Sequence, residues 1–188
     1  MAAPAPSPER AAALTRYYFL RAGVAAAWVA AAFTIGGANP LIGGVLLVLY
    51  PAWDAVANAR DALANGGLRA NPAQALNLGV SAVVALGVAL LMQVDMARVL
   101  QLFGAWAILA GLVQLLAGVR RWSAHGAQWA MILSGAQSAL AGGFFIQQSF
   151  APVVPSVLTT VAPYAAFGAF YFLVSAIALT IRNRPRKA

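Results

Sequence analysis

The chain contains no cysteine and few acidic residues: among its 188 residues there are 4 Asp or Glu, 12 Lys or Arg, and 1 His. Without cysteine it has no disulfides, thiolate metal sites or cysteine nucleophile. One His and scattered acids offer no spacing of metal ligands. A glycine-rich phosphate loop, a Ser/His/Asp set and paired catalytic carboxylates are also missing. We therefore predict that the protein is not an enzyme and uses no metal or other cofactor.

Hydrophobic residues make up 62% of the chain, whereas charged residues make up 9%. A soluble domain carries about 25% charged residues, and it could not bury this much apolar surface. Six segments reach the roughly 20 mostly apolar residues that cross a bilayer. They lie at residues 17–35, 41–59, 75–93, 98–119, 127–150 and 160–181.

An internal repeat groups these segments into pairs. Three similar stretches follow one another at a fixed step of 56 residues: Leu-Arg-Ala-Gly-Val at 20–24, Leu-Asn-Leu-Gly-Val at 76–80 and Ile-Leu-Ser-Gly-Ala at 132–136. Each stretch lies in the first segment of a pair, so the repeat unit is a helical hairpin. An alternative interpretation of residues 1–38 as a signal peptide is disfavoured, because the first segment aligns with two segments that cannot be signals.

The predicted fold class is therefore all-α, a polytopic membrane protein with six transmembrane helices arranged as three repeated helical hairpins. The hairpins cover residues 16–60, 75–121 and 127–182, which together form one membrane domain over 16–182. Residues 1–15 are predicted to be a disordered cytoplasmic N-terminus, and residues 183–188 a basic cytoplasmic tail.

Small residues recur along the helices at positions related by the repeat. Lipid gives little hydrophobic drive between helices, so association depends on close contact, which small residues on one face allow. We expect eight glycines to mark the helix contacts: Gly23, Gly79, Gly87, Gly104, Gly111, Gly135, Gly143 and Gly168.

The basic residues indicate the orientation. All Lys and Arg except Arg98 lie in or next to the termini and the two loops on one side of the predicted membrane domain. Positive loops remain in the cytoplasm, so both termini are predicted to be cytoplasmic. The basic side is expected to meet anionic lipids, and membrane topology explains the positive charge without nucleic acid as a partner. The sequence leaves open whether the chain forms a homo-oligomer.

Two charged residues lie inside predicted spans, Arg21 in the first and Asp54 in the second, at similar depth. The repeat places Asn77 and Gln114 at the equivalent positions of the second hairpin, and Leu133 and Ala178 at those of the third. In each hairpin the two positions are of the same kind: both charged in the first, both amides in the second and both apolar in the third. An unpaired ion in lipid costs about 3 kcal/mol, so this joint change predicts that the two positions are in contact. The pair is interpreted as structural, or alternatively as part of a proton or ion relay.

Further polar groups lie on the fifth segment and at its outer end. They would either make hydrogen bonds between helices and at the interface, which we favour, or line a polar cavity. These residues are Gln137, Ser138, Gln147 and Gln148. The single histidine, His125, lies in a basic loop, where we expect it to be solvated.

Three stretches carry a resemblance to a known family: Val99 to Gly111, Arg120-Arg121, and Trp129 to Gly142. In this order and spacing they resemble the short membrane repeat of the HdeD acid-resistance family, mainly over residues 75–182. The resemblance implies a six-span protein of the bacterial inner membrane that supports tolerance of acid or envelope stress. The alternative function is a small transporter or channel for protons or a small solute that uses the Arg21/Asp54 pair.

The predicted orientation can be tested with a reporter enzyme that is active only outside the cytoplasm. Fused after Ala188, the reporter should be inactive, because the positive-inside rule keeps this end in the cytoplasm. Fused after Asp95, in a loop predicted to lie outside, it should be active. Activity of the C-terminal fusion would contradict the orientation.

Overall fold

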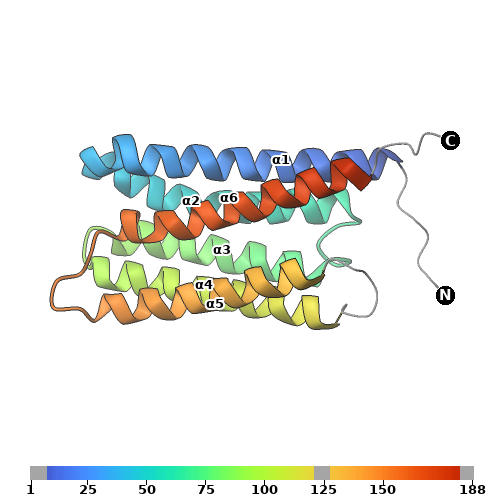
Figure 1. Cartoon of the computed structure of the whole chain (residues 1–188). Helices are drawn as coiled ribbons and strands as arrows, with labels where there is room; N and C mark the ends of the chain where they lie inside the picture. The colour runs from blue at the N-terminus through green and yellow to red at the C-terminus, as the bar shows by residue number, and fades with distance from the viewer. Residues whose placement is uncertain (1–7, 121–127, 183–188) are drawn as a thin grey trace.

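The structure, a computed structural model, describes residues 8–120 and 128–182. It is an all-α bundle in which consecutive helices run in opposite directions (Figure 1). The helices are α1 (Pro8–Ala31), which continues into the π-helical segment η1 (Ala32–Gly36), α2 (Pro40–Ala64), α3 (Pro72–Leu91), α4 (Met96–Arg120), α5 (Gln128–Ser149) and α6 (Val157–Arg182). Residues 183–188 and His125 lie outside the described residues.

The first helix begins earlier than predicted. Residues 8–15 were expected to be disordered but form the first turns of α1. Pro8 suits the start of a helix, where its missing N–H is not needed, and the alanines that follow are strong helix formers.

Local signals in the sequence set other boundaries. Asn39 caps α2, because its side-chain oxygen accepts hydrogen bonds from the backbone N–H groups of Leu41 and Ile42. Asp95 does the same for the first turn of α4. Between α2 and α3 the chain turns at Gly66 and Gly67, whose φ angles of 99° and 89° lie in the left-handed region that favours glycine.

Five segments within the described residues are long and apolar enough to cross a membrane: Ala11–Gly36, Pro40–Ala64, Pro72–Leu91, Met96–Leu116 and Val157–Arg182. Helix α5 was also predicted to span but is not among them. The chain thus has the helices of a membrane protein. Among the described residues, five of the six predicted spans are long and apolar enough to cross a membrane.

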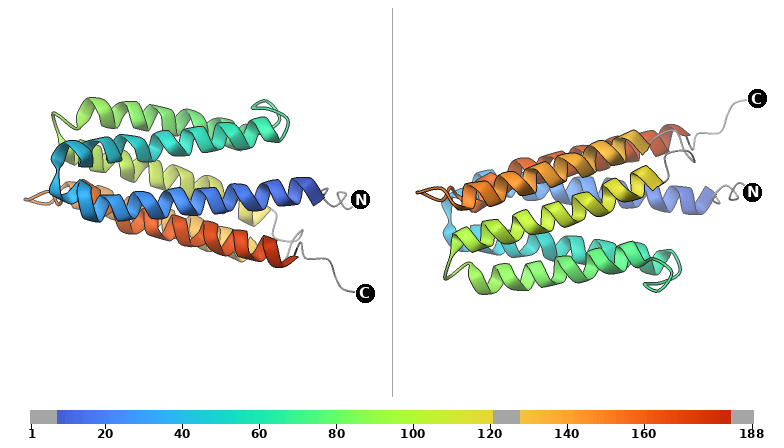
Figure 2. Two further views of the ribbon diagram at one scale, coloured as in Figure 1. Left: turned by 90° about the horizontal axis from the view of Figure 1, so that it is seen from above. Right: turned by 90° about the horizontal axis from the view of Figure 1, so that it is seen from below.

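The helices lie side by side as neighbours in chain order, and α6 closes against α1 (Figure 2). The closest packing is between α1 and α6, α2 and α3, and α4 and α5. These pairs combine helices from different predicted hairpins, whereas α1 with α2 and α5 with α6 make few contacts. The repeat therefore describes the order of helices along the chain, but the close contacts form between one hairpin and the next.

Glycine brings one pair of helices into backbone contact. Gly104 and Gly111 on α4 face Gly142 and Gly135 on α5. A Cβ atom built at Gly111 would lie 2.5 Å from the carbonyl oxygen of Gly135 and 2.6 Å from the backbone nitrogen of Ala139. The glycines on each helix are seven residues apart, close to two turns, so both lie on one stripe.

Three other glycines expected at contacts do not lie against a neighbouring helix. A Cβ atom at Gly23, Gly79 or Gly143 would have no neighbouring atom within 4 Å. Gly143 was expected at a contact because the 56-residue step relates it to Gly87, but the seven-residue stripe of α5 contains Gly142, which is buried against α4, and Gly143 is exposed. The two remaining glycines meet only side chains, namely Leu102 at Gly87 and the Tyr50 hydroxyl at Gly168, 4.0 Å away.

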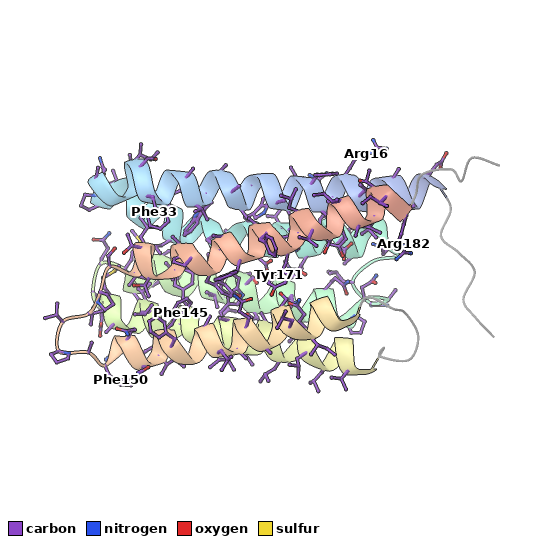
Figure 3. The ribbon with its side chains drawn as sticks, viewed as in Figure 1. Arg16, Phe33, Phe145, Phe150, Tyr171 and Arg182 are labelled. Carbon is purple, nitrogen blue, oxygen red and sulfur yellow. The ribbon has the colours of Figure 1, made fainter. Side chains whose placement is uncertain are left out.

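The basic ends of the helices lie together. Arg16 near the start of α1 and Arg182 at the end of α6 are at one end of the bundle, while Phe33 and Phe150 are at the other (Figure 3). The α2–α3 connection, with Arg69, joins the helices at the same end as Arg16 (Figure 1). The fold thus gathers these basic groups on one side.

The α4–α5 contact yields a stability prediction. Gly111→Ala should lower the free energy of unfolding by about 1–3 kcal/mol, because the added methyl group meets backbone atoms that cannot move independently. Thermal unfolding in detergent, followed by circular dichroism, would measure the change. The matched control is Gly143→Ala, which adds the same methyl group in open space and should leave stability unchanged or slightly raised. Equal effects of the two substitutions would contradict the contact.

Candidate functional site

An ion pair inside the membrane-spanning segments joins α1 to α2. Arg21 lies within the candidate span Ala11–Gly36, and Asp54 lies within the candidate span Pro40–Ala64. The Nη2 atom of Arg21 donates to Oδ1 of Asp54. Their side chains are 14% and 20% exposed, so most of both charged groups is sheltered within the bundle.

Arg21 makes two further contacts. Its Nη1 atom donates to the hydroxyl of Tyr17 at 3.2 Å, and that hydroxyl donates to the backbone carbonyl of Ala57 at 2.9 Å. Its Cζ atom lies 4.3 Å from the centre of the Phe172 ring on α6, a cation–π distance. The guanidinium group therefore links three helices, and among the described residues its Nε atom has no hydrogen-bond partner.

The second oxygen of the carboxylate is also occupied. Oδ2 of Asp54 accepts hydrogen bonds from Nδ2 of Asn58 and from the hydroxyl of Ser81, both at 2.9 Å. Asn58 is one turn further along α2, and Ser81 comes from α3. With Arg21, three donors point at one carboxylate, an arrangement that suits its ionised form.

The hydrogen bonds continue to a fourth helix. Nε1 of Trp106 on α4 donates to the hydroxyl oxygen of Ser81 at 3.0 Å. Because Ser81 accepts this bond, its own hydrogen is free to be donated to Asp54. The serine is fully buried and the tryptophan nearly so. A continuous chain, Arg21, Asp54, Ser81 and Trp106, thus ties α1 through α4; we call it the polar network.

Aromatic rings fill the centre of the bundle beside this network. Tyr50 of α2, Trp106 of α4 and Tyr164 of α6 form a closed triangle, with ring centres 5.4, 6.5 and 6.4 Å apart. All three pairs meet edge to face, the arrangement that aromatic quadrupoles favour. Trp28 stacks on Tyr50 at 4.7 Å, so the rings extend toward α1.

Comparison of the chain with protein-family models, curated proteins and solved structures finds no match. The candidate site is therefore judged on its geometry. Within residues 8–120 and 128–182 no three His, Cys, Asp or Glu side chains lie together as a metal site would require. The members of the polar network are joined to one another by hydrogen bonds, and these bonds connect α1, α2, α3 and α4.

No hydrogen bond joins the equivalent residues of the second hairpin within the part of the chain that the structure describes. Asn77 and Gln114 are both half-buried, and among the described residues neither makes a side-chain hydrogen bond. The repeat was expected to bring them together as it brings Arg21 to Asp54.

Polar residues of α5 serve contacts between helices. Oε1 of Gln137 accepts a hydrogen bond from the Tyr171 hydroxyl of α6 at 2.9 Å. The hydroxyl of Ser138 donates to the carbonyl of Ala107 on α4 and lies 2.9 Å from the Tyr164 hydroxyl. This matches the interpretation as hydrogen bonds between helices. At the far end of α5, Gln147 is exposed and Gln148 half-buried.

Two members of the site, Asn58 and Ser81, were missed by sequence reasoning, although each left a signal. Asn58 follows Asp54 by four residues, the spacing at which side chains on a helix meet. Ser81 precedes Gln137 by the 56-residue step, so the repeat places a polar residue inside a span twice at one position. No sequence pattern placed Trp106 opposite Ser81, since that contact depends on how α3 and α4 pack.

The ion pair gives a double-mutant test. Arg21→Leu leaves Asp54 without its cation and should cost about 3 kcal/mol or more of stability. The double variant Arg21→Leu/Asp54→Ala, which copies the apolar pair Leu133 and Ala178 of the third hairpin, should recover most of this loss. Thermal unfolding in detergent would measure both.

The control uses an exposed ion pair in the same chain. Arg98 pairs with Asp95 at 3.1 Å, but its side chain is 67% exposed, so Arg98→Leu should change stability by less than about 1 kcal/mol. If the double variant is no more stable than Arg21→Leu alone, the two charges are not coupled.

Proposed function

We propose that this chain is a non-enzymatic integral membrane protein of the bacterial inner membrane, similar to HdeD-type proteins, that supports tolerance of acid or envelope stress. The main support is the set of contacts inside the bundle. The carboxylate of Asp54 has three donors, and the rings of Tyr50, Trp106 and Tyr164 contact one another at the bundle centre. Such an interior holds helices together.

The stress role itself comes from the resemblance of residues 99–111, 120–121 and 129–142 to the HdeD repeat. The five candidate spans and the gathering of basic groups at one end agree with a multi-pass protein whose termini are cytoplasmic.

A second candidate function is transport of protons or a small solute. It is favoured by one observation, the presence of the Arg21–Asp54 pair at depth in two membrane spans, because ionisable residues in that position often mark ion pathways. The central rings argue against it, since they occupy the position where a path between α2, α4 and α6 would run.

The stress role predicts a phenotype. Deleting the gene should reduce survival of the host at low pH, and a plasmid copy of the wild-type chain should restore it. A copy with Arg21→Leu should restore it poorly, because the unpaired carboxylate lowers the amount of folded protein. Survival at low pH and the quantity of protein in the membrane fraction would be measured together. Unchanged survival of the deletion strain would remove the stress role.

Proteoliposomes separate the two candidates. With a pH-sensitive dye inside, wild-type protein should give no more proton flux than liposomes without protein. Flux that appears with the wild-type chain and is lost in Asp54→Asn would instead support the transporter. Asp61→Asn is the matched control, because Asp61 lies near the end of α2, where it bonds Asn65 and Gln74, outside the polar network.

A further inference from the structure

The interior of the bundle differs in polarity between its two ends. We call the end that holds Arg16, Arg69 and Arg182 the basic end (Figures 1 and 3). Toward the opposite end the largest interior side chains are apolar and fully buried. They include Leu47 of α2, Leu100 and Phe103 of α4, and Val157 of α6. The interior is therefore apolar and closed at that end.

Toward the basic end, α3 and α4 place amide side chains in the interior. Residues one turn or three turns apart lie on the same face of a helix. Asn77 precedes the fully buried Ser81 by one turn of α3, and Gln114 follows the fully buried Phe103 by three turns of α4. Both amides therefore belong to the inward faces of their helices.

Helices α5 and α6 place hydroxyl groups on their facing sides in the same part of the bundle. Ser134 lies one turn before Ser138, which contacts both α4 and α6. Ser175 lies one turn after Tyr171, whose hydroxyl bonds Gln137 of α5. Because α5 begins at the basic end and α6 ends there, both serines lie on the basic side of these contacts (Figure 1).

Six polar groups from five helices are without hydrogen bonds within the part of the chain that the structure describes. Each belongs to a half-buried residue, so neighbouring side chains do not close over it. In the hydrocarbon layer an unpaired polar group is costly, and a group of six indicates an occupant that supplies hydrogen bonds. The groups are the Tyr50 hydroxyl, the side-chain amides of Asn77 and Gln114, the Gln137 side-chain nitrogen, and the hydroxyls of Ser134 and Ser175.

The chemistry of these groups defines the occupant. Amides and hydroxyls both donate and accept hydrogen bonds, so they suit a ligand that does the same. The two charges nearby, Arg21 and Asp54, are paired with each other and leave no net charge for an ion to meet. The occupant is therefore small, polar and neutral.

Aromatic rings limit how far such an occupant can move. The triangle of Tyr50, Trp106 and Tyr164 crosses the interior between α2, α4 and α6. Phe145 meets Tyr164 edge to face, with ring centres 5.9 Å apart, and lies toward the end opposite the basic one, whereas Tyr171 is nearer the middle (Figure 3). The rings thus separate the polar part of the interior from the apolar part.

We propose that the interior between this ring triangle and the basic end is a hydrated binding site for small neutral polar molecules, which enter from the basic end. The proposal rests on the placement of the polar side chains and not on the stress role. A site that is closed at one end takes up a molecule without moving it across the membrane.

Single cysteines test the site, because the chain has none of its own. Ser134→Cys and Ser175→Cys replace one inward-facing atom each, while Leu133→Cys and Val174→Cys are the matched controls at exposed neighbouring positions. Each variant is reconstituted into phosphatidylcholine vesicles and treated with iodoacetamide, a small neutral amide, and alkylation is followed by mass spectrometry. Iodoacetamide attacks the thiolate, which forms in water but not in hydrocarbon, so the inward cysteines should react at least about tenfold faster than their neighbours. Equal rates would overturn the proposal.

A further cysteine tests the closure by the rings. Val161→Cys lies about one turn before Tyr164, in the apolar part of the interior, and Val161 is fully buried. It should remain unreactive toward iodoacetamide. Alkylation there as fast as at the inward serine positions would show that the rings do not close the site.

The wild-type chain gives an independent result. Radiolysis of water by X-rays produces hydroxyl radicals, which oxidise side chains that lie next to water. In vesicles Tyr171 should be oxidised faster than its neighbour Phe170, which is exposed on the outside of the bundle, when each rate is divided by its value in the unfolded chain. Oxidation of Tyr171 no faster than that of Phe170 would contradict a hydrated interior.

Discussion

Arg21 and Asp54 pair with each other inside two candidate spans, where neither charge can be left without a partner, and much of the bundle is arranged to meet that requirement. The carboxylate draws donors from α1, α2 and α3, and Ser81 passes the contact on to Trp106 of α4. The guanidinium group reaches Phe172 of α6. One ion pair thus orders five of the six helices, including α1 and α2, which pack against each other very little.

A different principle joins α4 to α5. Here glycines allow the two backbones to meet, and van der Waals contact replaces the hydrophobic drive that lipid does not supply. Ser138 adds a hydrogen bond to the carbonyl of Ala107 in the same interface. The bundle therefore combines one helix pair joined by backbone contact with other helices that polar and aromatic side chains link.

How much of this could be predicted differs between elements. The six apolar segments were found because each one must match the thickness of the bilayer, and each is a helix in the structure. The meeting of Arg21 with Asp54 followed from the joint change of two positions across the repeat. The same argument predicted contact of Asn77 with Gln114, and among the described residues no hydrogen bond joins them, because a repeat in sequence does not fix which polar atoms meet between helices.

The sequence by itself determined the helical segments, their order, the sidedness of the basic residues and the pair of charges that had to be neutralised, because these depend on local hydropathy and on the cost of a charge in lipid. Only the tertiary structure decided that hairpins pack most closely with their neighbours, that Gly142 rather than Gly143 meets α4, and that Ser81 connects Asp54 to Trp106. These outcomes depend on how far each helix is rotated about its axis. That rotation is set by all contacts together, so no single stretch of sequence contains it.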